Sequence, residues 1–137
     1  MGVQLNHTIV HARDQRASAE FYASVFGLGQ PRPFGPFLDV ETANGVTLAF
    51  FETQDPYDPQ HYAFLVTEAE FDQIFARVKA QGLDYWADPR KAEKGRINTL
   101  FGGRGVYFED PGGHFLEIIT RPYGEWPGAQ RVAAARK

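Results

Sequence analysis

Three polar side chains, two histidines and a glutamate, have the types and spacing of a metal site. His7 and His61 each lie in a short alternating segment, and Glu117 lies in the middle of another one. Neutral imidazoles and a carboxylate are typical ligands of a divalent metal, and three of them leave coordination positions open for oxygen, water or a chelating substrate. Metal-assisted chemistry on a small molecule is therefore one interpretation. The alternative interpretation is that they are two ordinary histidines near strand ends and a solvent-facing glutamate.

The two-residue period of a β-strand indicates that the three side chains share one face. Leu116 and Ile118 suit the face that packs under helices, so Glu117 points to the opposite face, where a carboxylate is unusual unless it is paired or binds a metal. The same alternation applies to the two strands that carry the histidines. There, the residues that suit the helix side are Thr8, Val10, Tyr62, Phe64 and Val66. His7 and His61 then lie on the side of Glu117, and we expect one concave surface that carries all three.

The composition excludes several other chemistries. The 137 residues include no cysteine, which rules out a thiolate zinc site, a cysteine nucleophile, disulfides and an iron–sulfur cluster. The serines, Ser18 and Ser24, fall in a helical pattern, which argues against a serine hydrolase. Any metal must therefore use His, Asp or Glu. We set aside His11 because it ends a strand and His114 because it flanks a turn.

The length of 137 residues indicates one compact domain, residues 1–137, and its charge and hydropathy argue against two classes of partner. A formal net charge of −3 and a pI near 5.8 provide no basic surface for nucleic acid. No apolar run approaches the roughly 20 residues of a membrane span. The first residues also lack the basic and apolar segments of a signal peptide, and we expect a cytoplasmic protein.

The elements that must position these side chains occur in the same order twice. The first half predicts a strand, a helix from the N-cap Asp14 to Gly27, and a hairpin around Asn44-Gly45; the strands are 5–11, 37–42 and 46–52. The second half predicts a strand, a helix that begins with a Thr67–Glu70 capping box, and three strands; the strands are 61–66, 83–87, 106–109 and 114–120.

The spacings support an internal duplication. A shift of 54 places His7 on His61 and Phe21 on Phe75, and a shift of 68 places Leu48 on Leu116. The difference, 68 − 54 = 14 residues, is the basic, glycine-rich stretch before residue 105. We therefore predict an α+β fold of two paired βαβββ modules, about 4–53 and 58–121, followed by a tail, 122–137.

One motif in the second module resembles a known family. The segment V-Y-F-E-D-P-G-G-H-F-L-E, Val106 to Glu117, is similar to the extradiol dioxygenase signature. The chain, over about residues 4–121, resembles the vicinal-oxygen-chelate superfamily of glyoxalases, bleomycin-resistance proteins, fosfomycin-resistance thiol transferases and extradiol dioxygenases. The resemblance implies a cup-shaped mixed sheet, small-molecule substrates, a homodimer, and a metal held by His7, His61 and Glu117.

Departures from the family patterns narrow the expected chemistry. Glyoxalase I takes a fourth ligand from the first module, and the matching position here, 117 − 68 = 49, is Ala49, which favours an open three-ligand site. The dioxygenase signature begins with an acid/base histidine, and this chain has Asn98 there. An amide cannot transfer that proton, which argues against true catechol cleavage and leaves Asn98 to orient a ligand. Where fosfomycin transferases place a hydroxyl, the chain has Ile9.

Tyr107 shares the parity of Glu117 and is the candidate for a substrate hydrogen bond or proton donor; alternatively, it fills an aromatic core. The expected pocket is lined by Ile9, Ala49, Phe51, Ala63, Leu65 and Phe115, with Asn98 as a further substrate contact. The expected function is that of a metal-dependent enzyme, closest by signature to extradiol dioxygenases. Fe²⁺ is favoured, with Mn²⁺, Zn²⁺ or Ni²⁺ as alternatives. A lyase, isomerase or thiol transferase, or a non-catalytic binding protein of the bleomycin-resistance kind, is the alternative.

Two segments allow more than one interpretation. The basic run Arg90, Lys91, Lys94 and Arg96 either closes over an anionic substrate as a lid or forms a solvated loop. The tail from Arg121, with Trp126, either packs on a neighbouring subunit or frays.

Overall fold

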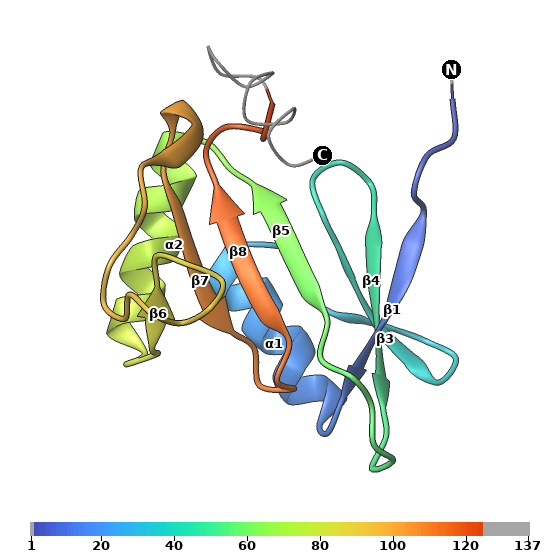
Figure 1. Ribbon diagram of the computed structural model, residues 1–137. Coiled ribbons are helices and arrows are strands. Elements are labelled where there is room, and N and C mark those ends of the chain that lie inside the picture. Colours follow the sequence, from blue (N-terminus) through green and yellow to red (C-terminus); the bar gives the residue numbers. More distant parts are fainter. Residues whose placement is uncertain (1, 125–137) are drawn as a thin grey trace. The chain divides into compact units, whose positions relative to one another are not determined.

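The computed structural model describes residues 2–124 (Figure 1). The elements occur in the order β1 (His7–Ala12), α1 (Gln15–Phe26), β2 (Arg32–Phe34), β3 (Phe37–Glu41), β4 (Thr47–Glu52), β5 (His61–Leu65), α2 (Glu68–Ala80), β6 (Tyr85–Trp86), η1 (Leu100–Gly102), β7 (Gly105–Glu109) and β8 (Phe115–Ile119). The chain divides into two compact units. Among the described residues, unit 1 consists of 2–59 and 110–114, and unit 2 consists of 60–109 and 115–124.

Unit 1 is a four-stranded mixed sheet with one helix on its face. The strand order is β1-β4-β3-β2, with β1 parallel to β4 and the other pairs antiparallel. The face under α1 is apolar because Val10, Leu38 and Phe50 alternate with residues of the other face, and all three are buried. Tyr22 of α1 packs on Phe50 with ring centroids 4.8 Å apart.

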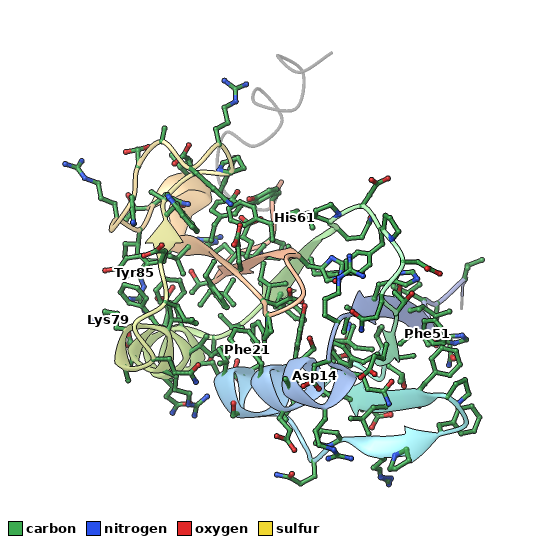
Figure 2. The ribbon with its side chains drawn as sticks, turned by 90° about the horizontal axis from the view of Figure 1, so that it is seen from below. Asp14, Phe21, Phe51, His61, Lys79 and Tyr85 are labelled. Atoms are coloured by element: carbon green, nitrogen blue, oxygen red, sulfur yellow. The ribbon has the colours of Figure 1, made fainter. Side chains whose placement is uncertain are left out.

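Helix α1 begins and ends where the sequence predicts. The Asp14 carboxylate accepts a hydrogen bond from the Ala17 N–H at 3.0 Å, and Gly27 ends the helix in a left-handed conformation with φ of 70°. Figure 2 shows Asp14 at the start of this helix and Phe21 farther along it.

Unit 2 repeats the architecture of unit 1. Its strand order is β5-β8-β7-β6, with β5 parallel to β8 and the other pairs antiparallel. Helix α2 begins at the predicted capping box, in which Thr67 and Glu70 exchange side-chain and backbone hydrogen bonds. The buried face of the helix consists of Phe71, Ile74 and Val78, and that of the sheet of Val106, Phe108, Leu116 and Ile118.

The register of the strands confirms the predicted pair of βαβββ modules. His7 lies opposite Thr47 in the first module, and His61 lies opposite Phe115 in the second. Because 47 + 68 = 115, the two parallel strand pairs have the same register under the predicted shifts. The sequence therefore places each module's histidine at an equivalent position of an equivalent sheet.

One strand of the fold is not predicted by the sequence pattern. Residues Arg32–Phe34 form β2, within a stretch that we interpreted as a break because of its prolines and glycine. Pro33 is accommodated because β2 is the last strand of its sheet, where a residue without an N–H leaves no neighbour unpaired. In the second module, β6 is shorter than the predicted strand at 83–87. No helix of the described residues is long and apolar enough to cross a membrane.

Candidate metal centre

His61 and Glu117 lie together on the face of unit 2 opposite α2. They belong to neighbouring parallel strands, and Glu117 is in register with Ala63, two residues beyond His61. This diagonal placement leaves 3.1 Å between His61 Nε2 and Glu117 Oε1. His61 is at the start of β5 (Figure 2) and its side chain is 48% exposed, whereas that of Glu117 is 3% exposed.

The facing atoms of His61 and Glu117 are both acceptors unless a proton or a metal ion lies between them. His61 Nδ1 is 3.0 Å from the backbone oxygen of Phe115. A carbonyl oxygen can only accept, so Nδ1 carries the ring hydrogen and a neutral imidazole then presents a lone pair at Nε2. That lone pair faces a carboxylate oxygen. A metal ion between the two atoms, or one proton shared by them, satisfies both.

The donor set fits a divalent metal. An imidazole nitrogen and a carboxylate oxygen are ligands for iron, manganese, zinc and nickel. The bond from Nδ1 to a backbone carbonyl is the outer contact that commonly orients a metal-binding histidine. Among the residues that the structure describes, however, no group of three or more His, Asp or Glu side chains gathers as a metal site. Of the three predicted ligands, the structure brings His61 and Glu117 together, and their role as ligands stays a prediction.

His7, the third predicted ligand, belongs to unit 1. It is exposed, and its Nδ1 is 2.7 Å from Asn6 Oδ1. Ile9, Ala49 and Phe51 follow along the same face of β1 and β4, because Ile9 is in register with Ala49. Ile9 is 45% exposed and Ala49 is 6% exposed. The role of His7 as a ligand stays a prediction.

Tyr107 lies beside His61 and Glu117. Its ring stacks on His61 at 5.9 Å and on Phe115 at 5.3 Å between centroids. Only 7% of Tyr107 is exposed. Burial raises the pKa of the Tyr107 hydroxyl, and the negative charge of Glu117 raises it further. The hydroxyl therefore keeps its proton at neutral pH and can donate a hydrogen bond.

Tyr123 is a residue of this cluster that the sequence analysis did not single out. Its hydroxyl donates a short hydrogen bond to Glu117 Oε2 and lies 3.5 Å from the Tyr107 hydroxyl. Its ring packs on Phe101, with centroids 4.5 Å apart. The only signal in the sequence is a tyrosine a few residues beyond the strand that carries Glu117.

Lys91 is the member of the basic run that approaches the aromatic cluster. Its Nζ lies 4.9 Å from the centre of the Trp86 ring and 5.1 Å from that of Phe115, and it forms an ion pair with Glu109. Lys94 Nζ is instead 3.4 Å from an Asp84 carboxylate oxygen on the surface. Lys91 thus gives the stretch one fixed contact with the face of the site.

Asn98 uses its amide for the backbone around it. Its Nδ2 donates to the Ala87 carbonyl oxygen at 2.8 Å, and its Oδ1 accepts from Leu100 N–H at 3.3 Å. The amide group lies against Gly105, where an added Cβ would come within 3.0 Å of it. Asn98 therefore fixes the entry into β7, and its contact with a substrate stays a prediction.

Residues 4–118 match the family model of the Glyoxalase/Bleomycin resistance protein/Dioxygenase superfamily, and the chain belongs to this superfamily.

Three known proteins illustrate the range of its relatives. The chain is 30% identical over 140 residues to "Glutathione transferase FosA" of Serratia marcescens, covering 97% of this chain and 88% of the relative. It is 28% identical over 128 residues to "Metallothiol transferase FosB" of Shouchella clausii (strain KSM-K16), covering 88% and 82%. Among solved structures it is similar to "Oxidase ChaP-H1", with 58% identity, a TM-score of 0.88, and coverage of 90% of this chain and 99% of that one.

Proposed function

We propose that this protein is a divalent-metal-dependent enzyme that oxidises a small substrate bound through neighbouring oxygen atoms, in the manner of the dioxygenases. The observation that carries the proposal is the facing pair His61 Nε2 and Glu117 Oε1, 3.1 Å apart and beside a protonated tyrosine. Its 58% identity to a protein named an oxidase supports oxidation over the other reactions of the superfamily. His7 is the proposed third ligand and Fe²⁺ the favoured metal, ahead of Mn²⁺, Zn²⁺ and Ni²⁺.

The residues of unit 2 supply the surroundings that such a reaction needs. A bound divalent metal supplies positive charge for the substrate oxygens and, if it is iron, electrons for dioxygen. Phe115 offers part of a ring surface against which a flat substrate can lie. The Tyr107 hydroxyl holds a proton and can donate it, or a hydrogen bond, to an oxygen that becomes negative. Further proposed substrate contacts are Ile9, Ala49, Phe51 and Asn98.

Metal analysis of protein purified without chelator tests the ligand set. We expect about one equivalent of metal in the wild type and much less in His7→Ala, His61→Ala and Glu117→Ala, because each substitution removes a proposed donor. His11→Ala is the matched control, since it removes a histidine of β1 outside the proposed ligand set. A wild type that carries no more metal than Glu117→Ala would contradict the proposal.

A thiol transferase is the second candidate, because the chain is 30% identical to a protein named a glutathione transferase. Oxygen uptake and loss of free glutathione separate the two activities. Protein loaded with Fe²⁺ is mixed in an oxygen electrode with a panel of aromatic compounds that carry neighbouring oxygen atoms, and protein loaded with Mn²⁺ is mixed with glutathione and fosfomycin. We expect oxygen uptake with a member of the panel other than a simple catechol, because Asn98 stands in place of the acid/base histidine of catechol cleavage, and no uptake by Glu117→Ala. Consumption of glutathione alone would favour the transferase.

We further propose that the chain acts as one domain of two modules, in the cytoplasm and as a homodimer. The superfamily resemblance supports the dimer. Light scattering coupled to size exclusion should then report about twice the chain mass of 15.4 kDa. A mass equal to one chain would contradict it.

A further inference from the structure

Tyr123 gives the two oxygens of Glu117 different environments. Oε1 faces His61 Nε2 at 3.1 Å, and Oε2 accepts the hydrogen bond from the Tyr123 hydroxyl. A buried carboxylate without such partners is free to turn about its last torsion, which is broad for glutamate. The hydrogen bond from Tyr123 removes that freedom and selects the oxygen that faces the imidazole.

The ring of Tyr123 is itself held in place. The chain leaves β8 at Ile119 and passes Pro122, and the ring then packs on Phe101 at 4.5 Å between centroids. Phe101 lies in η1, near the end of the basic, glycine-rich stretch. The hydroxyl is therefore directed at Glu117 by packing that does not depend on the hydroxyl.

The direction of the hydrogen bonds links Tyr123 to Tyr107. A tyrosine hydroxyl has one hydrogen, and that of Tyr123 is used on Glu117, so its oxygen can only accept from Tyr107. The distance of 3.5 Å is at the outer limit for a hydrogen bond. So long a contact leaves the Tyr107 hydrogen available to a substrate oxygen, whereas the hydrogen of Tyr123 stays on Glu117 Oε2.

We propose that Tyr123 is a positioning residue that makes Glu117 a one-oxygen ligand, with Oε1 presented beside His61 Nε2. This inference rests on the proposed metal site. A carboxylate held in this way is already in its binding orientation, so less ordering is needed when the metal binds. It also occupies one coordination position instead of two, which leaves room for two substrate oxygens.

Titration of the full chain with Co²⁺ tests this role without an activity assay. The visible absorption of Co²⁺ reports both the dissociation constant and the coordination geometry. Tyr123→Phe keeps the ring on Phe101 and removes only the hydroxyl, and we expect its Co²⁺ dissociation constant to rise about 10- to 100-fold, as for other outer partners of metal ligands. We also expect its spectrum to change, because Glu117 is free to bind through both oxygens.

Tyr85→Phe is the matched control, since Tyr85 packs on Phe75 of α2 and is in register with Phe108, on the strand face opposite that of Tyr107 and Glu117. Figure 2 shows Tyr85 beside the helix that carries Lys79. The control variant should bind Co²⁺ as the wild type does. If Tyr123→Phe also binds with the wild-type constant and spectrum while Tyr123→Ala does not, the ring alone matters and the inference is wrong. If the wild type binds Co²⁺ no better than Glu117→Ala, the proposed metal site fails and the inference fails with it.

Discussion

At the scale of single residues, two carboxylates of the same signature segment have opposite surroundings. Glu117 lies on the face of the site, where its partners are His61 and Tyr123. Asp110 is buried in unit 1, where it accepts hydrogen bonds from the Tyr22 hydroxyl at 2.6 Å and the His114 N–H at 2.8 Å. The Asp-Pro-Gly-Gly turn is therefore held by a buried acid.

His114 is part of the same buried cluster. It is fully buried, and its Nε2 donates to the backbone oxygen of His11 at 2.7 Å. The ring of Tyr57 lies between those of His11 and His114, stacked on each at 5.4 Å. The two histidines that we set aside at the level of sequence thus serve packing in unit 1.

Tyr22→Phe should destabilise the protein by about 1–3 kcal/mol at pH 7, because it leaves a buried carboxylate oxygen without its hydroxyl donor. Burial already raises the pKa of Asp110, and the hydrogen bond from Tyr22 opposes that rise. The variant should therefore raise the Asp110 pKa further. A raised pKa penalises the charged form, so the deficit should be largest at neutral pH and shrink as the pH falls and Asp110 is protonated.

Urea unfolding of the wild type and Tyr22→Phe at pH 7 and pH 4 measures this difference. Tyr85→Phe controls for the loss of a hydroxyl elsewhere. An equal deficit at both pH values would show that the bond to Asp110 is not its source.

At the scale of elements, capping and turn residues made the fold predictable. Asp14, Gly27 and the Thr67–Glu70 capping box fixed the helix ends because their hydrogen bonds and dihedral angles are local. The strand β2 was not predicted because a proline argues against a strand in the interior of a sheet but is tolerated in an edge strand. Whether a strand lies at the edge depends on the whole sheet and not on the local sequence.

The site was only partly predictable for a similar reason. Strand parity and repeat spacing were enough to bring His61 and Glu117 to one face. The contact of Tyr123 with Glu117 depends on how the chain turns after β8, and that turn has no periodic pattern. The same holds for Lys91, whose positive φ of 60° is set by its loop.

Arg104 fastens the start of α2 to the start of β7. Its guanidinium donates to Glu68 Oε1 at 2.8 Å and to Asp72 Oδ1 at 2.9 Å, and it lies over the Phe71 ring. Its backbone N–H donates to Thr120 Oγ1. One residue thus joins a helix to two neighbouring strand ends.

This arrangement predicts a pH dependence of stability. Hydrogen bonds from Thr120 and Arg104 lower the pKa of Glu68 below its ordinary value of 4.5. The folded state therefore favours the charged form, and the stabilisation is complete above about pH 4.5 and lost as the pH falls below it. Arg104→Met should lower the free energy of unfolding at pH 7, and the gap to the wild type should narrow in acid.

Chemical unfolding between pH 3 and pH 7 measures the gap. Arg16→Met is the control, because Arg16 makes a single exposed ion pair with Glu20 at 3.4 Å. If the difference in unfolding free energy between the wild type and Arg104→Met does not change with pH, the effect of the substitution comes from packing on Phe71.

At the scale of the whole molecule, the duplication gives two modules with the same arrangement of strands and different side chains at equivalent positions. The shift of 68 relates Ala49 to Glu117 and Asp39 to Tyr107, and the register pairs Asp39 with Ala49 as it pairs Tyr107 with Glu117. The second module therefore carries His, Glu and Tyr where the first carries His, Ala and Asp. Asp39 Oδ1 is also a buried oxygen without a hydrogen-bond partner among the described residues.

Ala49→Glu places in the first module the glutamate that the second module carries at the equivalent position. Ala49 is 6% exposed and lies opposite Asp39, so the new carboxylate is placed in a buried site beside another one. Without metal, like charges and desolvation should lower the melting temperature. With Zn²⁺ the variant should gain more stability than the wild type, because His7, Asp39 and the new carboxylate offer donors on neighbouring strands of one sheet.

Ala49→Gln is the control, because glutamine has the same length as glutamate without the charge. Calorimetry of both variants with and without Zn²⁺ separates the effect of side-chain size from that of charge. If Zn²⁺ raises the melting temperatures of the two variants equally, the equivalence of the modules does not extend to metal binding.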